Sequence, residues 1–263
     1  NKTDGETKAM LVHYACHPVI SGENAVSSEF CGFAMETLER EIGSGAICAF
    51  LQGCCGDINP YGGLDPNIEG PAAVEGLGRI LARDALGVMD KGLRRMGFAP
   101  IASSTFRERL PYDRFEETED WRGIADDDTE PEHRREWARR FAEQPARLRS
   151  YAAFEAIRLT IADGLTLLAM NAEVVVELGL LVKQASGGSM LPLGYCNGMV
   201  GYIPTVRQLQ EGGYEAYDST FYFNMPAPFA PAAGDIARRE LGAIAGGEPP
   251  DSSAANRSSP RAT

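Results

Sequence analysis

Apolar positions recur along the chain with two different periods, which predict the order of its elements. Residues 8–19 mix apolar, aromatic and β-branched side chains before a proline, which is typical of a strand that ends near His17. The run "AICAFL" at 46–51 is continuously apolar, as expected of a strand covered on both faces. Between them we expect a helix capped by Ser27 or Ser28, because apolar residues recur at every fourth position: Phe30, Ala34, Leu38 and Ile42.

The middle of the chain continues the alternation of strands and helices. A second helix is expected from Pro71, with one apolar stripe along it: Val74, Leu77, Leu81 and Val88. Residues 154–171 contain two strand-like runs around the turn "ADG", which predicts a β-hairpin. A helix-like run, "EVVVELGLLVKQA", then begins directly at Glu173.

Two further helices and one charged segment complete the pattern. Thr205 and Gln208 form a capping box for a short helix that a pair of glycines stops, and a last helix is expected over 232–245. Residues 107–150 are rich in charge and predict an excursion from the domain, with a solvated helix near 132–143.

Together these elements predict an α/β fold in which mixed β-sheets are flanked by helices. We expect one domain over 1–246 and a disordered tail over 247–263, where Pro, Ser and Ala dominate. The chain begins at Asn1 and soon enters a strand-like run, so we expect it to be part of a longer protein. The preceding segment could then carry targeting and catalytic residues.

Composition narrows the class of function. The 37 acidic residues exceed the 25 basic ones and give a net charge of −12, with no basic cluster that could follow a phosphate backbone. Nucleic-acid binding is therefore not expected. No run approaches the roughly 20 apolar residues of a transmembrane helix, and no signal peptide opens the chain. The six cysteines lack CxxC spacing, which argues against a zinc ribbon or a disulfide framework.

The three histidines are not equally good candidates for a functional site. His17 stands at a strand end directly before a proline, where ligands and catalytic groups tend to be presented. His13 lies four residues earlier and is expected to pack in the sheet, because HxxxH alone is a weak metal motif. His133 lies in the charged helix and is expected to be a surface or packing residue.

The segment "LQGCCGDINP" at 51–60 admits a metal site, a nucleophile or a structural bend. A cysteine nucleophile needs a group that lowers its pKa, whereas the carboxylate of Asp57 would raise it. Cys54 and Cys55 are adjacent and project to opposite sides of an extended chain, so they are poor joint metal ligands. We therefore favour a bend.

The bend interpretation gives each flanking residue a role. Gly53 and Gly56 can take positive φ or allow close backbone approach, while Asp57 and Asn59 can cap free amides. A second candidate carboxylate is Glu173, which stands in a sequence apolar on both sides and needs either a partner or a metal. A role at the N-terminus of the following helix is the alternative, and Glu177 could face the same cavity or solvent.

Four blocks resemble one family, the neutral/alkaline non-lysosomal ceramidases, and in particular its shorter bacterial members. The blocks occur in the family's order: "YACHPV" (14–19), "QGCCGDINP" (52–60), "NAEVVVELG" (171–179) and "CNGMVGYIPT…EGGYEA" (196–216). The resemblance implies the family's catalytic domain, without its C-terminal immunoglobulin-like domain. It also implies hydrolysis of an amide bond in sphingolipid metabolism.

The resemblance further implies a catalytic zinc bound by two histidines, a glutamate and a tyrosine. The matching ligands are His17, Glu173 and Tyr202, and the second histidine would lie upstream of residue 1. In the family's Pro-Gly-Glu block, Asn171 and Ala172 replace the first two residues.

One position in the segment 51–60 departs from the family's pattern. The family's loop reads Gly-Asp-x-Ser-Pro, and Asn59 takes the place of its essential serine. Because asparagine cannot be a nucleophile, a serine-dependent mechanism is excluded, and water activated by zinc remains. Asp57, Asn59 and Tyr202 are then the expected catalytic residues. The substrate class is a small-molecule or lipid amide.

Two alternatives remain beside this hydrolase. The first is a non-catalytic homologue that binds a lipid or a glycan, which the loss of the serine favours. The second is an acyl hydrolase that uses Cys54 or Cys55 as its nucleophile.

Overall fold

The structure is a computed structural model, which describes residues 5–60, 70–113, 118–145 and 148–247. Its strands are β1 (Ala9–Tyr14), β2 (Ile47–Gln52), β3 (Ala102–Pro111), β4 (Tyr151–Ala162), β5 (Leu165–Met170), β6 (Glu173–Val174), β7 (Met190–Leu193) and β8 (Tyr202–Ile203). Its α-helices are α1 (Glu29–Ile42), α2 (Pro71–Asp90), α3 (Thr118–Asp126), α4 (Glu132–Glu143), α5 (Val176–Ala185), α6 (Val206–Glu211), α7 (Ser219–Tyr222) and α8 (Pro231–Gly246), with a π-helix at Tyr214–Asp218 before α7. This confirms the predicted α/β class. The expected disordered tail, apart from Gly247, lies outside the described residues.

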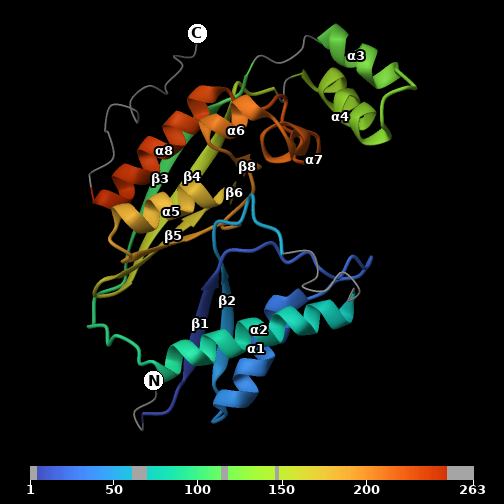
Figure 1. The fold of residues 1–263 in the computed structure, drawn as a ribbon. Coiled ribbons are helices and arrows are strands. Elements are labelled where there is room, and N and C mark those ends of the chain that lie inside the picture. Colours follow the sequence, from blue (N-terminus) through green and yellow to red (C-terminus); the bar gives the residue numbers. More distant parts are fainter. Residues whose placement is uncertain (1–4, 61–69, 114–117, 146–147, 248–263) are drawn as a thin grey trace.

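The first half folds as a parallel β1–α1–β2 unit in the lower part of Figure 1. Helices α1 and α2 pack on one face of these two strands around a core that includes Phe30, Leu38, Cys48 and Leu81. The other face is only partly covered, since Ile47 is 66% exposed. The expectation that this strand is buried on both faces is therefore wrong, because both helices lie on the same side.

The helix boundaries follow from local sequence. Phe30, Ala34 and Leu38 are fully buried, which confirms the predicted four-residue period of α1. The hydroxyl of Ser27 accepts a hydrogen bond from the backbone N–H of Glu29 at 2.9 Å, while Ser28 makes no side-chain cap bond. Helix α2 begins at Pro71, where the missing N–H costs no hydrogen bond, as predicted.

The second half is built on a mixed four-stranded sheet of order β3-β4-β5-β7. Strands β3, β4 and β5 are antiparallel neighbours, and β7 joins β5 in parallel. The predicted hairpin is the β4–β5 pair. Helices α5 and α8 lie over one face of the sheet (Figure 1). The largest hydrophobic core of the described residues lies between these helices and the sheet, and it includes Leu168, Met170, Leu178 and Leu241.

The charged segment is shorter than the sequence indicates. Strand β3 continues to Pro111 in the sheet, so residues 107–111 are not part of an excursion. Helices α3 and α4 project from the upper part of the molecule (Figure 1). They pack on each other through Trp121, Trp137 and Phe141. The helix expected near 132–143 is α4, and it has one buried face.

Glu173 lies in a strand and not in a helix. Residues Glu173 and Val174 form β6, which pairs in parallel with β8, and Glu173 is in register with Tyr202. Helix α5 starts at Val176. The helix expected from Glu173 onward therefore begins three positions later, and the N-terminal capping alternative for Glu173 is wrong.

The remaining expectations concern a cap, the cysteines and the membrane. Thr205 and Gln208 form the predicted capping box: the Gln208 N–H donates to Thr205 Oγ1 at 3.2 Å, and the Thr205 N–H donates to Gln208 Oε1 at 2.9 Å. All six cysteines are free thiols, four of them buried. Across the described segments, none of the helices combines the length and apolar character needed to cross a bilayer.

Candidate functional site

His17 is held at the point where the chain leaves β1. Its backbone N–H donates to the carbonyl oxygen of Ile58 at 2.9 Å, and its Nδ1 lies 3.2 Å from the same oxygen. Because a carbonyl oxygen only accepts, Nδ1 carries a proton. The Nε2 atom of the ring therefore points away from this loop, toward another partner.

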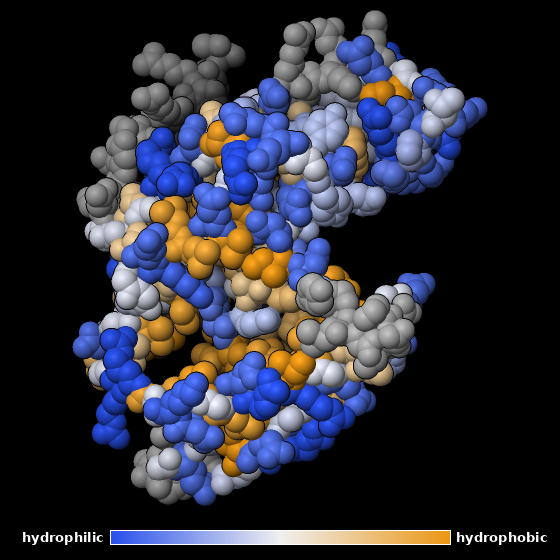
Figure 2. Space-filling view, viewed as in Figure 1, coloured by the Kyte–Doolittle hydropathy of each residue, from blue (hydrophilic) through white to orange (hydrophobic). Residues whose placement is uncertain are grey.

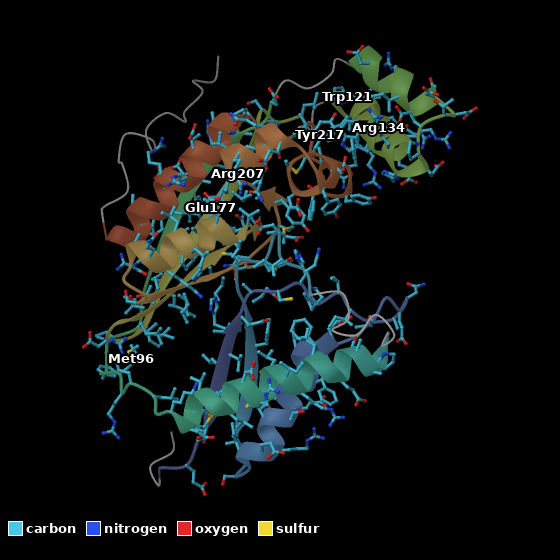
Figure 3. All side chains as sticks on the ribbon, viewed as in Figure 1. Met96, Trp121, Arg134, Glu177, Arg207 and Tyr217 are labelled. Carbon is cyan, nitrogen blue, oxygen red and sulfur yellow. The ribbon has the colours of Figure 1, made fainter. Side chains whose placement is uncertain are left out.

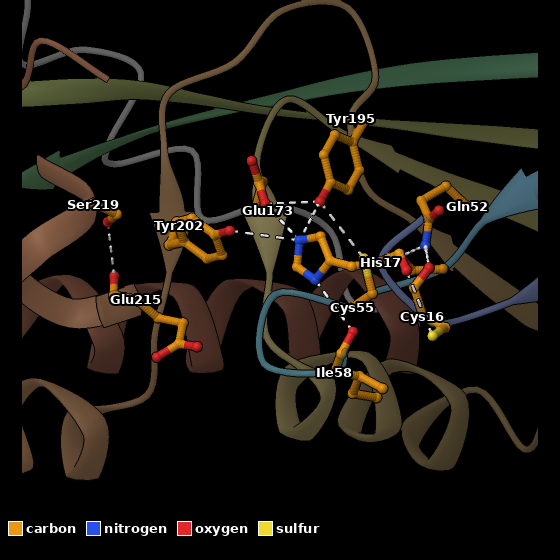
Figure 4. A network of polar contacts seen from close by, with 11 residues as sticks. Cys16, His17, Gln52, Cys55, Ile58, Glu173, Tyr195, Tyr202, Glu215 and Ser219 are labelled. Carbon is orange, nitrogen blue, oxygen red and sulfur yellow. Dashed lines mark hydrogen bonds and ion pairs between the residues drawn. The ribbon is translucent and has the colours of Figure 1, made fainter. Parts of the chain in front are cut away.

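That partner is Glu173, as Figure 4 shows. Its Oε2 lies 2.9 Å from His17 Nε2, and both side chains are 11% exposed. The backbone N–H of Glu173 donates to Gly201 O at 3.0 Å, which fixes this strand beside the loop before β8. Both residues were predicted as site residues from the sequence, and the fold brings them into contact.

The electrostatics of the two groups are coupled. Desolvation disfavours charge on His17, but interactions with Cys55 and Glu173 outweigh it and raise the pKa of the imidazole to about 10. Desolvation likewise works against the Glu173 carboxylate, yet hydrogen bonds from His17, Tyr195 and Tyr202 lower its pKa. The pair thus favours one positive and one negative partner.

Two tyrosines reach the same point. Tyr202, selected from the sequence, has its hydroxyl 3.5 Å from His17 Nε2. Tyr195, which the sequence analysis did not select, lies closer: its hydroxyl is 2.7 Å from His17 Nε2 and 2.7 Å from Glu173 Oε2. The only local signal for Tyr195 is its place in a glycine-containing turn after a buried strand.

The "GCCGD" bend docks this site onto β6. A Cβ on Gly56 would lie 2.8 Å from the carbonyl oxygen of Glu173, and the Gly56 N–H donates to Val174 O at 3.0 Å. A Cβ on Gly53 would meet Ala15 Cβ at 3.0 Å. Neither glycine has positive φ. Close backbone approach, and not turn geometry, is therefore what these positions need.

The two cysteines of the bend have different surroundings. Cys54 packs in the large core beside Gly179, and desolvation raises the pKa of its thiol, the opposite of what a nucleophile needs. Cys55 is fully buried, with Sγ 3.6 Å from the Tyr195 hydroxyl. The Ile58 carbonyl orients His17 through Nδ1, and the imidazole interacts with Cys55 as well as with Glu173 and Tyr195. A cysteine nucleophile is therefore disfavoured at Cys54, whereas at Cys55 it stays a prediction.

Asp57 and Asn59 occupy the outer part of the bend. Asp57 Oδ1 accepts from the Val176 N–H at 2.7 Å, and its Oδ2 accepts from Gln208 Nε2 at 3.1 Å. Asp57 thus supports the first turn of α5 and connects it to α6. Asn59 is exposed, immediately after Ile58, which holds His17.

The other candidates from the sequence lie elsewhere. His13 Nε2 contacts the carbonyl oxygen of Pro192 at 2.8 Å, which joins β1 to β7 and confirms a packing role. Glu177 lies 3.5 Å from Arg238 and 3.8 Å from Arg207 on the outer surface, where Figure 3 shows Glu177 and Arg207 on neighbouring helices. Glu177 therefore faces solvent and not the site.

Aromatic side chains continue from the site toward α4. The Tyr202 ring contacts Tyr214 and Phe223, with centroid distances of 5.7 Å to each. Tyr222 stacks on His133 at 5.3 Å, which confirms a packing role for that exposed histidine. In space-filling view the surface is hollowed between the part that carries α4 and α7 and the part that carries α1 and α2 (Figure 2).

The donor atoms at His17 suit a cation. When Nε2 of His17 is unprotonated, the lone pairs of three atoms meet: this nitrogen, Oε2 of Glu173 and the oxygen of Tyr195. The Tyr195 hydroxyl has a single proton to share among them. Imidazole nitrogen and carboxylate oxygen are ligands that zinc uses. Among the described residues no three His, Cys, Asp or Glu gather, so any metal here needs tyrosine oxygens or a further ligand.

Two solved structures have a fold similar to that of this chain. Neutral ceramidase from Pseudomonas aeruginosa superposes with a TM-score of 0.64 at 17% identity, over 93% of this chain and 44% of that one. A ceramidase complexed with C2 gives a TM-score of 0.64 at 13% identity, over 93% and 46% of the two chains. The chain has the neutral ceramidase fold.

This result confirms the resemblance drawn from the four sequence blocks at the level of the fold. The chain spans less than half the length of these two ceramidases. No family model and no curated protein matches the sequence. The similarity is therefore one of fold, and the chemistry of the site depends on its own residues.

Proposed function

We propose that this protein is a zinc-dependent hydrolase that cleaves an N-acyl amide bond. The observation that carries the proposal is the contact between His17 Nε2 and Glu173 Oε2, with the Nδ1 proton already committed to Ile58. This nitrogen and this oxygen lie 2.9 Å apart with both side chains largely buried, an arrangement that needs a proton or a metal ion between or beside them. The ceramidase fold supports a hydrolase with this chemistry.

His17, Glu173 and Tyr202 would hold the metal, and the family resemblance implies a second histidine as a further ligand. A zinc ion in such a site polarises a carbonyl and makes water acidic near neutral pH. Ile58 fixes the tautomer of His17 through its carbonyl, as outer hydrogen bonds do for metal-binding histidines. As the alternative to binding the metal, the Tyr202 hydroxyl would donate a hydrogen bond to the developing oxyanion.

Asn59 and Asp57 would serve the substrate from the bend. The exposed Asn59 amide can donate a hydrogen bond to the carbonyl oxygen of the amide, although it cannot attack it. Asp57 holds the bend in place through Val176 and Gln208, so its contribution would be to position Asn59. A small-molecule or lipid amide fits this proposal.

A second candidate is a ceramidase-like protein that binds a lipid or a glycan without turnover. The observation in its favour is Asn59, which stands where the resembling family has its serine. It differs from the first candidate in one testable respect, because it requires no metal-dependent product.

The experiment that tests the proposal is an amide hydrolysis assay on the full-length protein. The protein is stripped with a chelator, reloaded with zinc and assayed with short N-acyl fluorogenic amides and with ceramide. We expect activity that zinc restores and that His17→Ala abolishes in a folded protein. Lipid or glycan binding that survives chelation, without product from any amide, would favour the second candidate. The variant Asn59→Ser tests whether ceramide cleavage depends on this position.

A further inference from the structure

Tyr195 is the nearest phenol to the candidate metal ligands, although neither the sequence nor the family resemblance points to it. Its hydroxyl lies 2.7 Å from both His17 Nε2 and Glu173 Oε2, whereas the Tyr202 hydroxyl lies 3.5 Å from Nε2. The ring stands edge-on to His17, with centroids 6.2 Å apart and an interplanar angle of 87°. The Tyr195 oxygen therefore meets both ligand atoms at once.

The backbone fixes Tyr195 in this position. Three consecutive residues donate to two other segments of the chain: Gly194 to Gln52 O at 3.2 Å, Tyr195 to Ala172 O at 3.1 Å, and Cys196 to Met170 O at 2.9 Å. Tyr195 itself has φ +60°, a left-handed conformation that is uncommon for a residue with a side chain. Such strain persists only where surrounding structure imposes it, and it concentrates at functional sites.

The Tyr195 oxygen lies at hydrogen-bonding distance from both candidate ligand atoms. Without a metal, a protonated Nε2 of His17 donates to this oxygen and the Tyr195 hydroxyl donates to Glu173, so the three atoms form one hydrogen-bonded group. A metal ion would take the place of these protons, because a histidine must be neutral to bind a metal. The Tyr195 oxygen would then lie beside the metal together with the other two donor atoms.

We propose that Tyr195 supplies a phenolic oxygen to the metal, beside His17 and Glu173, in addition to or in place of Tyr202. This proposal rests on the proposed function, because it needs the metal that the function requires. It assigns the metal environment an oxygen from the β7–β8 loop, which a metal would then tie to β1 and β6.

The test uses copper(II) as a spectroscopic probe, since imidazole sites bind it tightly and a phenolate ligand gives it a visible charge-transfer band. The full-length protein is titrated with copper(II), as are Tyr195→Phe, Tyr202→Phe and His17→Ala. Phenylalanine keeps the ring that packs on His17 and removes only the hydroxyl. Zinc affinity is measured in parallel by competition with a chromophoric chelator, and thermal unfolding confirms that each variant is folded.

We expect the band in the wild-type protein and in Tyr202→Phe, and its loss or a clear decrease in its intensity in Tyr195→Phe, together with a decrease in zinc affinity of about tenfold or more. A band of undiminished intensity in Tyr195→Phe would overturn the proposal, as would tight copper binding by the wild type without any such band. A wild type that binds neither copper nor zinc at His17 would overturn the proposed function as well, so the two failures can be told apart.

Discussion

His17 Nε2 and Glu173 Oε2 lie 2.9 Å apart although 156 positions separate the two residues in the chain. One belongs to the end of β1 and the other to β6, so the contact exists only where the first half of the molecule docks on the second. The "GCCGD" bend forms that junction, through Gly56 to Val174 and through Asp57 to Val176. Changes in the bend should therefore affect both stability and the site.

The substitution Gly56→Ala should be destabilising. Its Cβ would lie 2.8 Å from Glu173 O and 3.1 Å from Val175 N, which are backbone atoms that cannot swing aside. Overpacking of this kind costs about 1–3 kcal/mol. The free energy of unfolding, measured in urea, should fall by this amount, and the shift of β6 should weaken metal binding.

The matched control is Gly76→Ala in α2. Nothing lies within 4 Å of the added Cβ, and its φ is not positive, so alanine should stabilise the helix by about 0.4–1 kcal/mol. Equal effects of the two substitutions would show that the junction does not need a glycine at position 56.

Asp57→Ala should destabilise the protein by about 1 kcal/mol, the usual cost of a lost acceptor at the start of a helix. It leaves the Val176 N–H and the Gln208 amide without the carboxylate that each contacts, at 2.7 Å and 3.1 Å respectively. Asp84→Ala removes an exposed carboxylate that pairs with Arg83, and it should change the unfolding free energy much less. A larger loss for Asp84 than for Asp57 would contradict this role.

Asn59→Ala should reduce the rate of amide hydrolysis without affecting stability. The side chain is exposed, so its removal leaves no cavity. If its amide donates to the developing oxyanion, kcat should fall on the order of a hundredfold, while the unfolding midpoint stays constant. A change confined to KM would instead assign Asn59 to ground-state binding.

Glu29 should make the free energy of unfolding depend on pH in the acidic range. Desolvation works to raise the pKa of its carboxyl, but hydrogen bonds from Ser21, Ile20 and Phe30 outweigh it and hold the pKa below its ordinary value. The carboxylate therefore stabilises the fold above that ordinary value, and the contribution is lost as pH falls through the lowered one. The gap in unfolding free energy between wild type and Glu29→Gln should narrow between about pH 6 and pH 3.

The exposed Glu36 on the same helix provides the control for charge alone. Glu36→Gln should change the unfolding free energy little across this pH range. A gap for Glu29→Gln that stays constant down to pH 3 would rule out the capping role of its carboxylate at Ile20 and Ser21.

The periodic parts of the fold could be predicted from sequence, because local burial determines them. The stripe of Phe30, Ala34 and Leu38 and the capping box at Thr205 appear as expected. The exposed face of β2 was not predicted, since a continuous apolar run does not reveal how many layers cover a strand. The start of α5 was also placed too early, because the apolar run at Glu173 fits a short strand and a helix equally well.

Part of the candidate site could be predicted from the sequence. His17, Glu173 and Tyr202 could be selected because they stand in recognisable blocks, and their roles as metal ligands stay a prediction. Tyr195 could not be selected, because its contact with His17 comes from three backbone hydrogen bonds to distant segments. No periodic pattern encodes such a contact.

The proposed hydrolysis depends on the binding of a metal by His17 and Glu173. Elemental analysis of the full-length protein tests this binding, beside His17→Ala and Glu173→Ala, with Glu177→Ala on the outer surface as the control. We expect about one zinc per chain in the wild type and in Glu177→Ala, and a loss of zinc in the other two variants. An absence of zinc from a folded wild type, or a zinc content that neither His17→Ala nor Glu173→Ala changes, would show that these residues do not bind the metal.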